Sequence, residues 1–89
     1  MTVVFYGRVI EHTGGEKSYV PKVQDSALTV RELLDELGSH YGESFETFIH
    51  GDETCLILVN GSGITQTGGL DSPIVSGDKV EILPFVDAG

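Results

Sequence analysis

The sequence predicts an α+β domain in which one main helix packs across a mixed sheet of four to five strands. A segment with the apolar period of a helix spans residues 30–41, and strand-like segments rich in β-branched residues lie on both sides of it. A chain of 89 residues has room for one hydrophobic core. We therefore expect a single domain, with a body over residues 1–84 and a flexible C-terminal tail over residues 85–89.

Two strand-like segments precede the helix. Residues 2–10 are rich in β-branched and aromatic side chains and lead into the turn-forming stretch 13–15, so we expect a first strand there. Residues 18–23 are expected to pair with it as an antiparallel hairpin. Pro21 lies inside this second segment, and because proline donates no ladder hydrogen bond, we expect an edge or irregular strand.

The start of the main helix has a clear signature. Thr29 stands three residues before Glu32, which is the spacing of a capping box. One helical face is then lined by apolar and aromatic residues at the expected spacing, namely Val30, Leu33, Leu34, Leu37 and Tyr41. Gly38 or Gly42 is expected to end the helix.

Beyond the main helix, residues 43–50 are expected to add a short helical turn whose core-facing side chains are Phe45, Phe48 and Ile49. Residues 54–60 form a continuous apolar run that predicts a strand. The pair Asn60 and Gly61 predicts a tight reversal at the end of that strand, since both residues tolerate a positive φ.

The last third of the chain alternates turns with short apolar stretches. Residues 64–65 are expected to form a strand stub, and residues 66–76 an irregular stretch anchored by Leu70, Ile74 and Val75. A turn at residues 77–78 leads into residues 79–83, whose alternating polar and apolar side chains predict a half-buried strand. Pro84 is expected to end that strand.

Composition argues against several classes of function. The chain carries 14 acidic and five basic residues, a net charge of -9 that disfavours nucleic-acid binding and suits a basic protein partner. Its single cysteine, Cys55, excludes an intrachain disulfide and is expected to be buried because it begins an apolar run. No apolar run approaches the roughly 18 residues that span a bilayer. We expect a cytoplasmic protein that is a monomer when free.

No set of residues has the pattern of an active site or a metal site. The three histidines, His12, His40 and His50, lack zinc-ligand spacing to one another or to Cys55, and we expect them at the surface. The glycine pairs at 14–15 and 68–69 match no phosphate-binding motif and are expected to form turns. We therefore expect no bound cofactor, no bound metal and no catalysis by this chain alone.

Four segments, taken in order, resemble a known family. They are the helix start 29–37, the strand end 58–61, the turn 76–80 and the closing stretch 82–89. Together they resemble the MoaD/ThiS family of ubiquitin-like sulfur carriers, whose fold is the β-grasp. The long segment before the helix, with Gly14 and Gly15 in its loop, is most similar to the small subunit of molybdopterin synthase.

This resemblance implies a function for the C-terminal glycine. In that family, a partner enzyme of the ubiquitin-activating type uses ATP to adenylate the terminal carboxylate, and sulfur then replaces AMP to give a thiocarboxylate. The carrier passes this sulfur to a biosynthetic enzyme, which for the molybdenum or tungsten cofactor is the large subunit of molybdopterin synthase or a related acceptor. Gly89 is the residue that the resemblance makes reactive in this chain.

The C-terminal stretch departs from the family pattern at two positions. Family members usually end Pro-Pro-Val-x-Gly-Gly, whereas this chain has Phe85 at the second proline and Ala88 at the penultimate glycine. If the partner's channel requires a positive φ at residue 88, an L-residue such as alanine raises the free energy of the bound tail by about 1 to 2 kcal/mol. The five residues 85–89 can extend roughly 17 Å. That reach lets the carboxylate enter a buried ATP site while the body stays outside.

Strand alternation suggests which side chains meet a partner, because successive residues point to opposite faces of a sheet. One assignment places four residues under the helix, namely Ile57, Val59, Val80 and Ile82. The predicted partner-binding residues then face outward or lie in the tail, and they are Leu56, Leu58, Leu83, Phe85, Val86, Asp87 and Ala88. The opposite assignment of the two faces is also compatible with the alternation.

Three alternatives share this fold. The chain could be a protein modifier that forms isopeptide bonds through Gly89, a sulfur carrier of the thiamine pathway, or an inert β-grasp interaction module. Because the modifier and both kinds of carrier pass through the same adenylated intermediate, the sequence leaves these alternatives open.

Overall fold

The computed structural model describes residues 1–21, 28–50, 55–66 and 68–84. Its main feature is a five-stranded mixed sheet with the strand order β2-β1-β7-β4-β5. The strands of this sheet are β1 (Thr2–Phe5), β2 (Ser18–Tyr19), β4 (Cys55–Val59), β5 (Ser62–Gly63) and β7 (Lys79–Pro84). The central strand, β7, runs parallel to β1 and antiparallel to β4. The α+β class and the mixed sheet are therefore confirmed.

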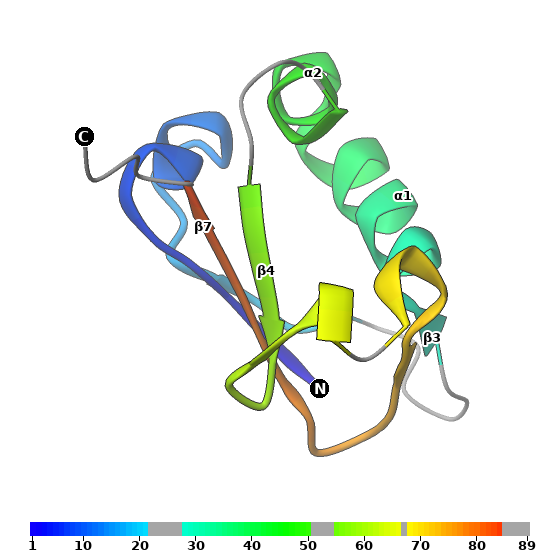
Figure 1. The fold of residues 1–89 in the computed structure, drawn as a ribbon. Coiled ribbons are helices and arrows are strands. Elements are labelled where there is room, and N and C mark those ends of the chain that lie inside the picture. Colours follow the sequence, from blue (N-terminus) through cyan, green and yellow to red (C-terminus); the bar gives the residue numbers. More distant parts are fainter. Residues whose placement is uncertain (22–27, 51–54, 67, 85–89) are drawn as a thin grey trace, which may run out of the picture.

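Two helices cover one side of this sheet (Figure 1). The predicted main helix is α1 (Val30–Tyr41), and its capping box is confirmed. Thr29 Oγ1 accepts a hydrogen bond from Glu32 N at 3.1 Å, and Glu32 Oε1 accepts one from Thr29 N at 3.0 Å. Gly42 ends the helix with a φ of 99°, a conformation that glycine adopts without strain.

The second helix, α2 (Glu43–His50), is longer than the short turn that the sequence predicts. It buries Phe45 and Phe48, and Ile49 is half-buried. The described residues also form three 3-10 turns, namely η1 (Gly7–His12), η2 (Ile64–Gln66) and η3 (Gly69–Asp71). A separate ribbon of β3 (Leu28–Thr29) and β6 (Pro73–Ile74) leads into α1. Within the described ranges, every helix is too short or too polar to pass through a lipid bilayer.

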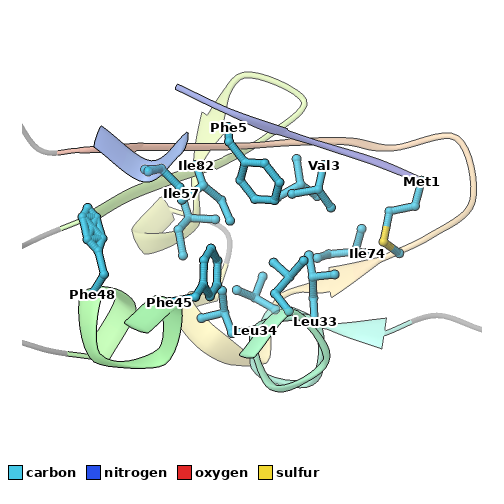
Figure 2. Packing of buried hydrophobic residues seen from close by; sticks show 14 residues of the cluster. Met1, Val3, Phe5, Leu33, Leu34, Phe45, Phe48, Ile57, Ile74 and Ile82 are labelled. Atoms are coloured by element: carbon cyan, nitrogen blue, oxygen red, sulfur yellow. The ribbon is translucent and has the colours of Figure 1, made fainter. Parts of the chain in front are cut away.

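The core lies between the sheet and the two helices (Figure 2). Its buried members are Met1, Val3, Phe5, Val9, Val30, Leu33, Leu34, Leu37, Phe45, Phe48, Ile57, Ile74, Val80 and Ile82. In the figure, Leu34 and Phe45 point from the helices toward Phe5 and Ile82 of the sheet. The rings of Phe5 and Phe45 meet edge-on with centroids 6.0 Å apart, an arrangement that aromatic pairs favour.

The first strand is shorter than predicted. β1 ends at Phe5 and residues 7–12 form η1, so the prediction of a strand over residues 6–10 is wrong. The physical reason is Gly7, whose φ of 58° turns the backbone out of the extended conformation. Val9 is nevertheless fully buried. The apolar pattern of this segment therefore indicated burial correctly, and the reversal at one glycine decided its secondary structure.

The predicted hairpin between the first two strands is confirmed. β1 and β2 pair antiparallel, with Val3 opposite Tyr19, and β2 lies at the edge of the sheet. β2 ends at Tyr19 and so stops before Pro21, whose side chain is buried. Residues 22 and 23 of the predicted strand lie outside the described residues.

The segment after β4 follows the prediction in part. Asn60 and Gly61 have φ values of 52° and 86°, so the predicted reversal is confirmed. The strand that leaves it is β5, while residues 64–66 form η2, so the predicted stub at 64–65 is wrong. Ile74 is buried through the pairing of β6 with β3, and alternation then turns Val75 outward. Val75 and Leu70 are 48% and 36% exposed and are not anchors.

A carboxylate joins two turns at one end of the sheet. Asp78 accepts hydrogen bonds from the backbone N–H of Val75 at 2.9 Å and from the side-chain amide of Asn60 at 3.0 Å. Asn60 Oδ1 in turn accepts a hydrogen bond from Lys79 N at 3.0 Å. The bond from Val75, and after it that from Asn60, hold the pKa of Asp78 below its ordinary value of 3.8. These contacts fix the turn before β7 against the turn after β4.

The stability of the fold should depend on the charge of Asp78. A lowered native pKa contributes stability that is present above 3.8 and is lost as the pH falls through the native pKa. We expect Asp78→Asn to lower the free energy of unfolding at neutral pH, measured by urea denaturation. The difference from wild type should shrink as the pH falls below 3.8. Asp35→Asn, at an exposed position of α1, is the control, and a difference that stays constant with pH would contradict this role of Asp78.

Candidate functional site

Three of the residues predicted to meet a partner, Leu56, Leu58 and Leu83, lie on the sheet face that the helices leave uncovered, which we call the outer face. Its apolar members are Leu56, which is 41% exposed, and the half-buried Leu58 and Leu83. Leu56 and Leu83 lie opposite each other on β4 and β7, so their side chains are neighbours. The inward residues are the buried Ile57, Val80 and Ile82 and the half-buried Val59, which packs against the core. The structure thus decides between the two assignments of the faces.

A carboxylate lies among these leucines. Glu81 is opposite Leu58 in the register of β4 and β7, and its Oε2 accepts a hydrogen bond from Tyr6 Oη at 2.7 Å. Lys79 Nζ lies 3.8 Å from the same oxygen. The hydrogen bond to Glu81 is the largest cause that raises the pKa of the Tyr6 hydroxyl above its ordinary value of 10.0. The outer face therefore combines apolar contact area with a carboxylate that a basic partner side chain can bind.

β7 carries the chain to one end of the outer face. Its last residue, Pro84, lies opposite Cys55 of β4 and follows Leu83 directly. The tail residues predicted to react or to bind lie outside the described residues, and they are Phe85, Val86, Asp87, Ala88 and Gly89. The predicted tail therefore begins two residues beyond an outer-face leucine.

The histidines and the cysteine form no metal site in the described part of the chain. His12 is half-buried rather than fully at the surface, and its ring stacks on Phe48 with centroids 4.6 Å apart. His40 is exposed, as predicted, and the side chain of His50 lies outside the described residues. Cys55 is half-buried against the core, which is less burial than predicted. Among the described residues, no three His, Cys, Asp or Glu side chains are placed to hold a metal ion.

Sequence reasoning missed the polar contacts of three tyrosines. Besides the bond of Tyr6, Tyr41 Oη donates to Glu16 Oε1 at 2.7 Å, and Tyr19 Oη donates to Glu36 Oε2 at 2.9 Å. Burial is the largest cause that raises the pKa of both Tyr19 and Tyr41. Because Tyr19 lies opposite the buried Val3, these two contacts belong to the helix side of the sheet. They connect β2 and the loop before it to α1, on the side of the sheet away from the outer face.

The ThiS family matches residues 3–89 of this chain. No curated protein sequence matches it.

Solved structures share the whole architecture. A chain of the BexX/CysO complex from Amycolatopsis orientalis is 30% identical, with a TM-score of 0.77 over 99% of this chain and 98% of that chain. SAMP1 from Haloferax volcanii is 22% identical, with a TM-score of 0.78 over 99% of this chain and 97% of its own. A putative molybdopterin converting factor, subunit 1, from Pyrococcus furiosus is 22% identical, with a TM-score of 0.70 over 96% and 95%. The latter two show the fold alone, which is the ubiquitin-like β-grasp.

Proposed function

Because this chain belongs to the ThiS family, we propose that it is a sulfur carrier for molybdopterin biosynthesis whose reactive group is the carboxylate of Gly89. The observation that carries this proposal is the family match itself, which extends from residue 3 through Gly89. A terminal glycine suits the role because a residue without a side chain lets another protein's backbone approach closely.

The proposed chemistry consists of two displacements at Gly89. First, a carboxylate oxygen attacks the α-phosphorus of ATP in the partner's site, the bond from that phosphorus to the bridging oxygen breaks, and pyrophosphate leaves. Second, hydrosulfide attacks the acyl carbon, the bond to AMP breaks, and a thiocarboxylate forms with loss of a proton. Neither step oxidises or reduces the carboxyl carbon, so ATP and hydrosulfide are the only co-reactants. The chain supplies the carboxylate, and the partner supplies the catalytic groups.

In this proposal the activating enzyme docks on the outer face. Leu56 and Leu83 supply neighbouring apolar side chains there, and Glu81 offers a carboxylate to a basic residue of the partner. The net charge of -9 favours encounter with a partner whose binding surface is basic. Since Phe85 follows two residues after Leu83, a partner bound to the outer face lies next to the start of the tail. The tail then bridges the remaining distance, up to roughly 17 Å.

The cofactor pathway is proposed from the segment before α1. This chain has a β1–β2 hairpin with η1 between its strands, in the long segment that resembles the small subunit of molybdopterin synthase. The putative molybdopterin converting factor of Pyrococcus furiosus shares the fold at 22% identity and gives the pathway assignment no further support. The proposed destination of the sulfur is therefore the molybdenum or tungsten cofactor, with the large subunit of molybdopterin synthase or a related enzyme as acceptor.

Intact mass spectrometry tests the proposal directly. The chain is incubated with an adenylating enzyme of the ubiquitin-activating type from the same organism, ATP and sodium sulfide. A mass gain of one sulfur-for-oxygen exchange is expected, and it should disappear without ATP. Transfer of that sulfur to the large subunit of molybdopterin synthase tests the pathway. Transfer only to a thiamine-pathway acceptor would contradict the molybdopterin assignment and favour the thiamine alternative.

The protein-modifier alternative differs only in the second displacement. A lysine amine would attack the same acyl-adenylate, so that AMP leaves and an isopeptide bond forms. The chain carrying an N-terminal affinity tag would then appear in cell extract as higher-mass conjugates that depend on ATP and on Gly89. Conjugates without any thiocarboxylate would favour the modifier, and no change under either condition would favour an inert interaction module.

A charge on the outer face should weaken activation without unfolding the protein. We expect Leu56→Asp to raise the KM of the activating enzyme for this chain by about tenfold with kcat unchanged, because the variant loses apolar contact made equally in the ground and transition states. The control is Leu70→Asp, the same substitution at a similarly exposed position of η3, which contacts α1 rather than the outer face. Equal KM values for the two variants would contradict docking at Leu56.

A further inference from the structure

The chain leaves β1 at the place where β7 ends. Tyr6 N donates the last hydrogen bond of this ladder, to Ile82 O at 3.1 Å. In a parallel ladder the next donor would be the N–H of residue 84, and Pro84 has none. The backbone of Gly7 therefore comes to lie against the ring of Pro84 instead of pairing with it. Figure 1 shows the turn η1 beside the end of β7.

Gly7 differs from the other glycines with a positive φ in the part of the chain that the structure describes. Its φ is 58°, and a Cβ at this position would lie 3.0 Å from Cγ and 3.3 Å from Cδ of Pro84. A proline ring cannot swing aside as a long flexible side chain can. Gly14, with a φ of 68°, has open space around the same position, and so does Gly69 at 69°. A residue with a side chain at position 7 would be strained by the positive φ and would also crowd the ring of Pro84.

We propose that Gly7 is a positioning residue for the C-terminal tail, and that it acts by holding Pro84, the residue from which the tail begins. This inference rests on the proposed function. A partner docked on Leu83 must receive the chain two residues later, so the place and direction in which the backbone leaves Pro84 decide whether the carboxylate can enter the ATP site. A fixed starting residue also removes part of the ordering entropy from the threading step, because that residue is already ordered.

Three variants separate this role from general destabilisation. Gly7→Ala introduces both a strained φ and a contact with Pro84, whereas Gly14→Ala introduces a similar strain in open space. The double variant Gly7→Ala with Pro84→Ala keeps the strain at residue 7 and removes the ring atoms that the new methyl group meets. Urea denaturation establishes that each variant is folded under the assay conditions. ATP–pyrophosphate exchange with the activating enzyme then gives kcat and KM for each.

Gly7→Ala is expected to lower kcat by about tenfold, because the threading step would then have to order one more residue. KM should be nearly unchanged because the outer face is intact. Gly14→Ala should match wild type, and the double variant should exceed Gly7→Ala. Amide hydrogen exchange of Leu83, which needs no partner, should accelerate in Gly7→Ala and not in Gly14→Ala. Equal kcat for the two single variants would overturn the role of Gly7 and leave the proposed function intact. A wild-type chain that no activating enzyme adenylates would contradict the proposed function as well.

Discussion

Deleting Gly89 is expected to abolish thiocarboxylate formation and to leave the free energy of unfolding unchanged. The deletion moves the terminal carboxylate to Ala88 and shortens its reach from Pro84 by about 3.5 Å. The core should not be affected, because its described members lie between Met1 and Ile82. Intact mass after incubation with the activating enzyme, ATP and sulfide measures the first effect, and urea denaturation measures the second.

The matched control is Ala88→Gly, which keeps the chain length and the position of the carboxylate. It should be thiocarboxylated at least as fast as wild type, since glycine accepts both extended and positive-φ conformations. A gain of about tenfold would indicate that the partner's channel requires a positive φ at residue 88. A Gly89 deletion that still gains sulfur would contradict the assigned reactive group. One that unfolds the protein would contradict the separation of tail and body.

Local signals predicted most elements of the fold. The capping box at Thr29 and Glu32 involves neighbours in the chain, so its geometry follows from their spacing alone. The reversal at Asn60 and Gly61 is local for the same reason. Alternation in β7 correctly grouped Val80 and Ile82 on one face because strand geometry fixes a period of two. These features needed no knowledge of the rest of the molecule.

The errors arose where tertiary contacts override a local pattern. Residues 6–10 have the composition of a strand, but Gly7 turns the backbone at a φ of 58°, and its backbone there lies close to Pro84 at the end of β7. Val75 looked like an anchor beside Ile74, yet the pairing of β6 with β3 admits only Ile74 to the core. Such outcomes depend on segments that are distant in the chain, such as Leu28 for Ile74 and Pro84 for Gly7, which periodicity within a short window does not contain.

The sequence predicted the candidate site in part, as it did the fold. Alternation grouped Leu56, Leu58 and Leu83, but the choice between the two faces required the packing of α1 and α2 against the sheet. The bond between Tyr6 and Glu81 joins residues 75 apart in the chain, so no local motif reveals it. The site predicted at Gly89 comes from family resemblance, because its chemistry resides in a backbone carboxylate that no side-chain pattern marks.

Phe45→Ala is expected to lower the free energy of unfolding by about 3 to 5 kcal/mol. Phe45 is 1% exposed, and its ring packs on Phe5 and on Tyr41 with centroids 6.0 and 5.5 Å away. Alanine would leave a cavity between α2 and the sheet, and the surrounding side chains can fill it only in part. Since a domain of this size has a total stability of roughly 4 to 13 kcal/mol, the loss is a large fraction of the whole. Urea denaturation at constant temperature measures it.

Thr47→Ala provides the control within the same helix, because Thr47 is exposed and its truncation should change the free energy of unfolding by no more than about 0.5 kcal/mol. The outer face lies on the opposite side of the sheet from Phe45, so Phe45→Ala should retain its kcat and KM for activation once the rates are referred to the folded fraction. A loss below about 1 kcal/mol would contradict the packing of α2 on the core. Unchanged stability with lost activation would instead place Phe45 at the partner interface.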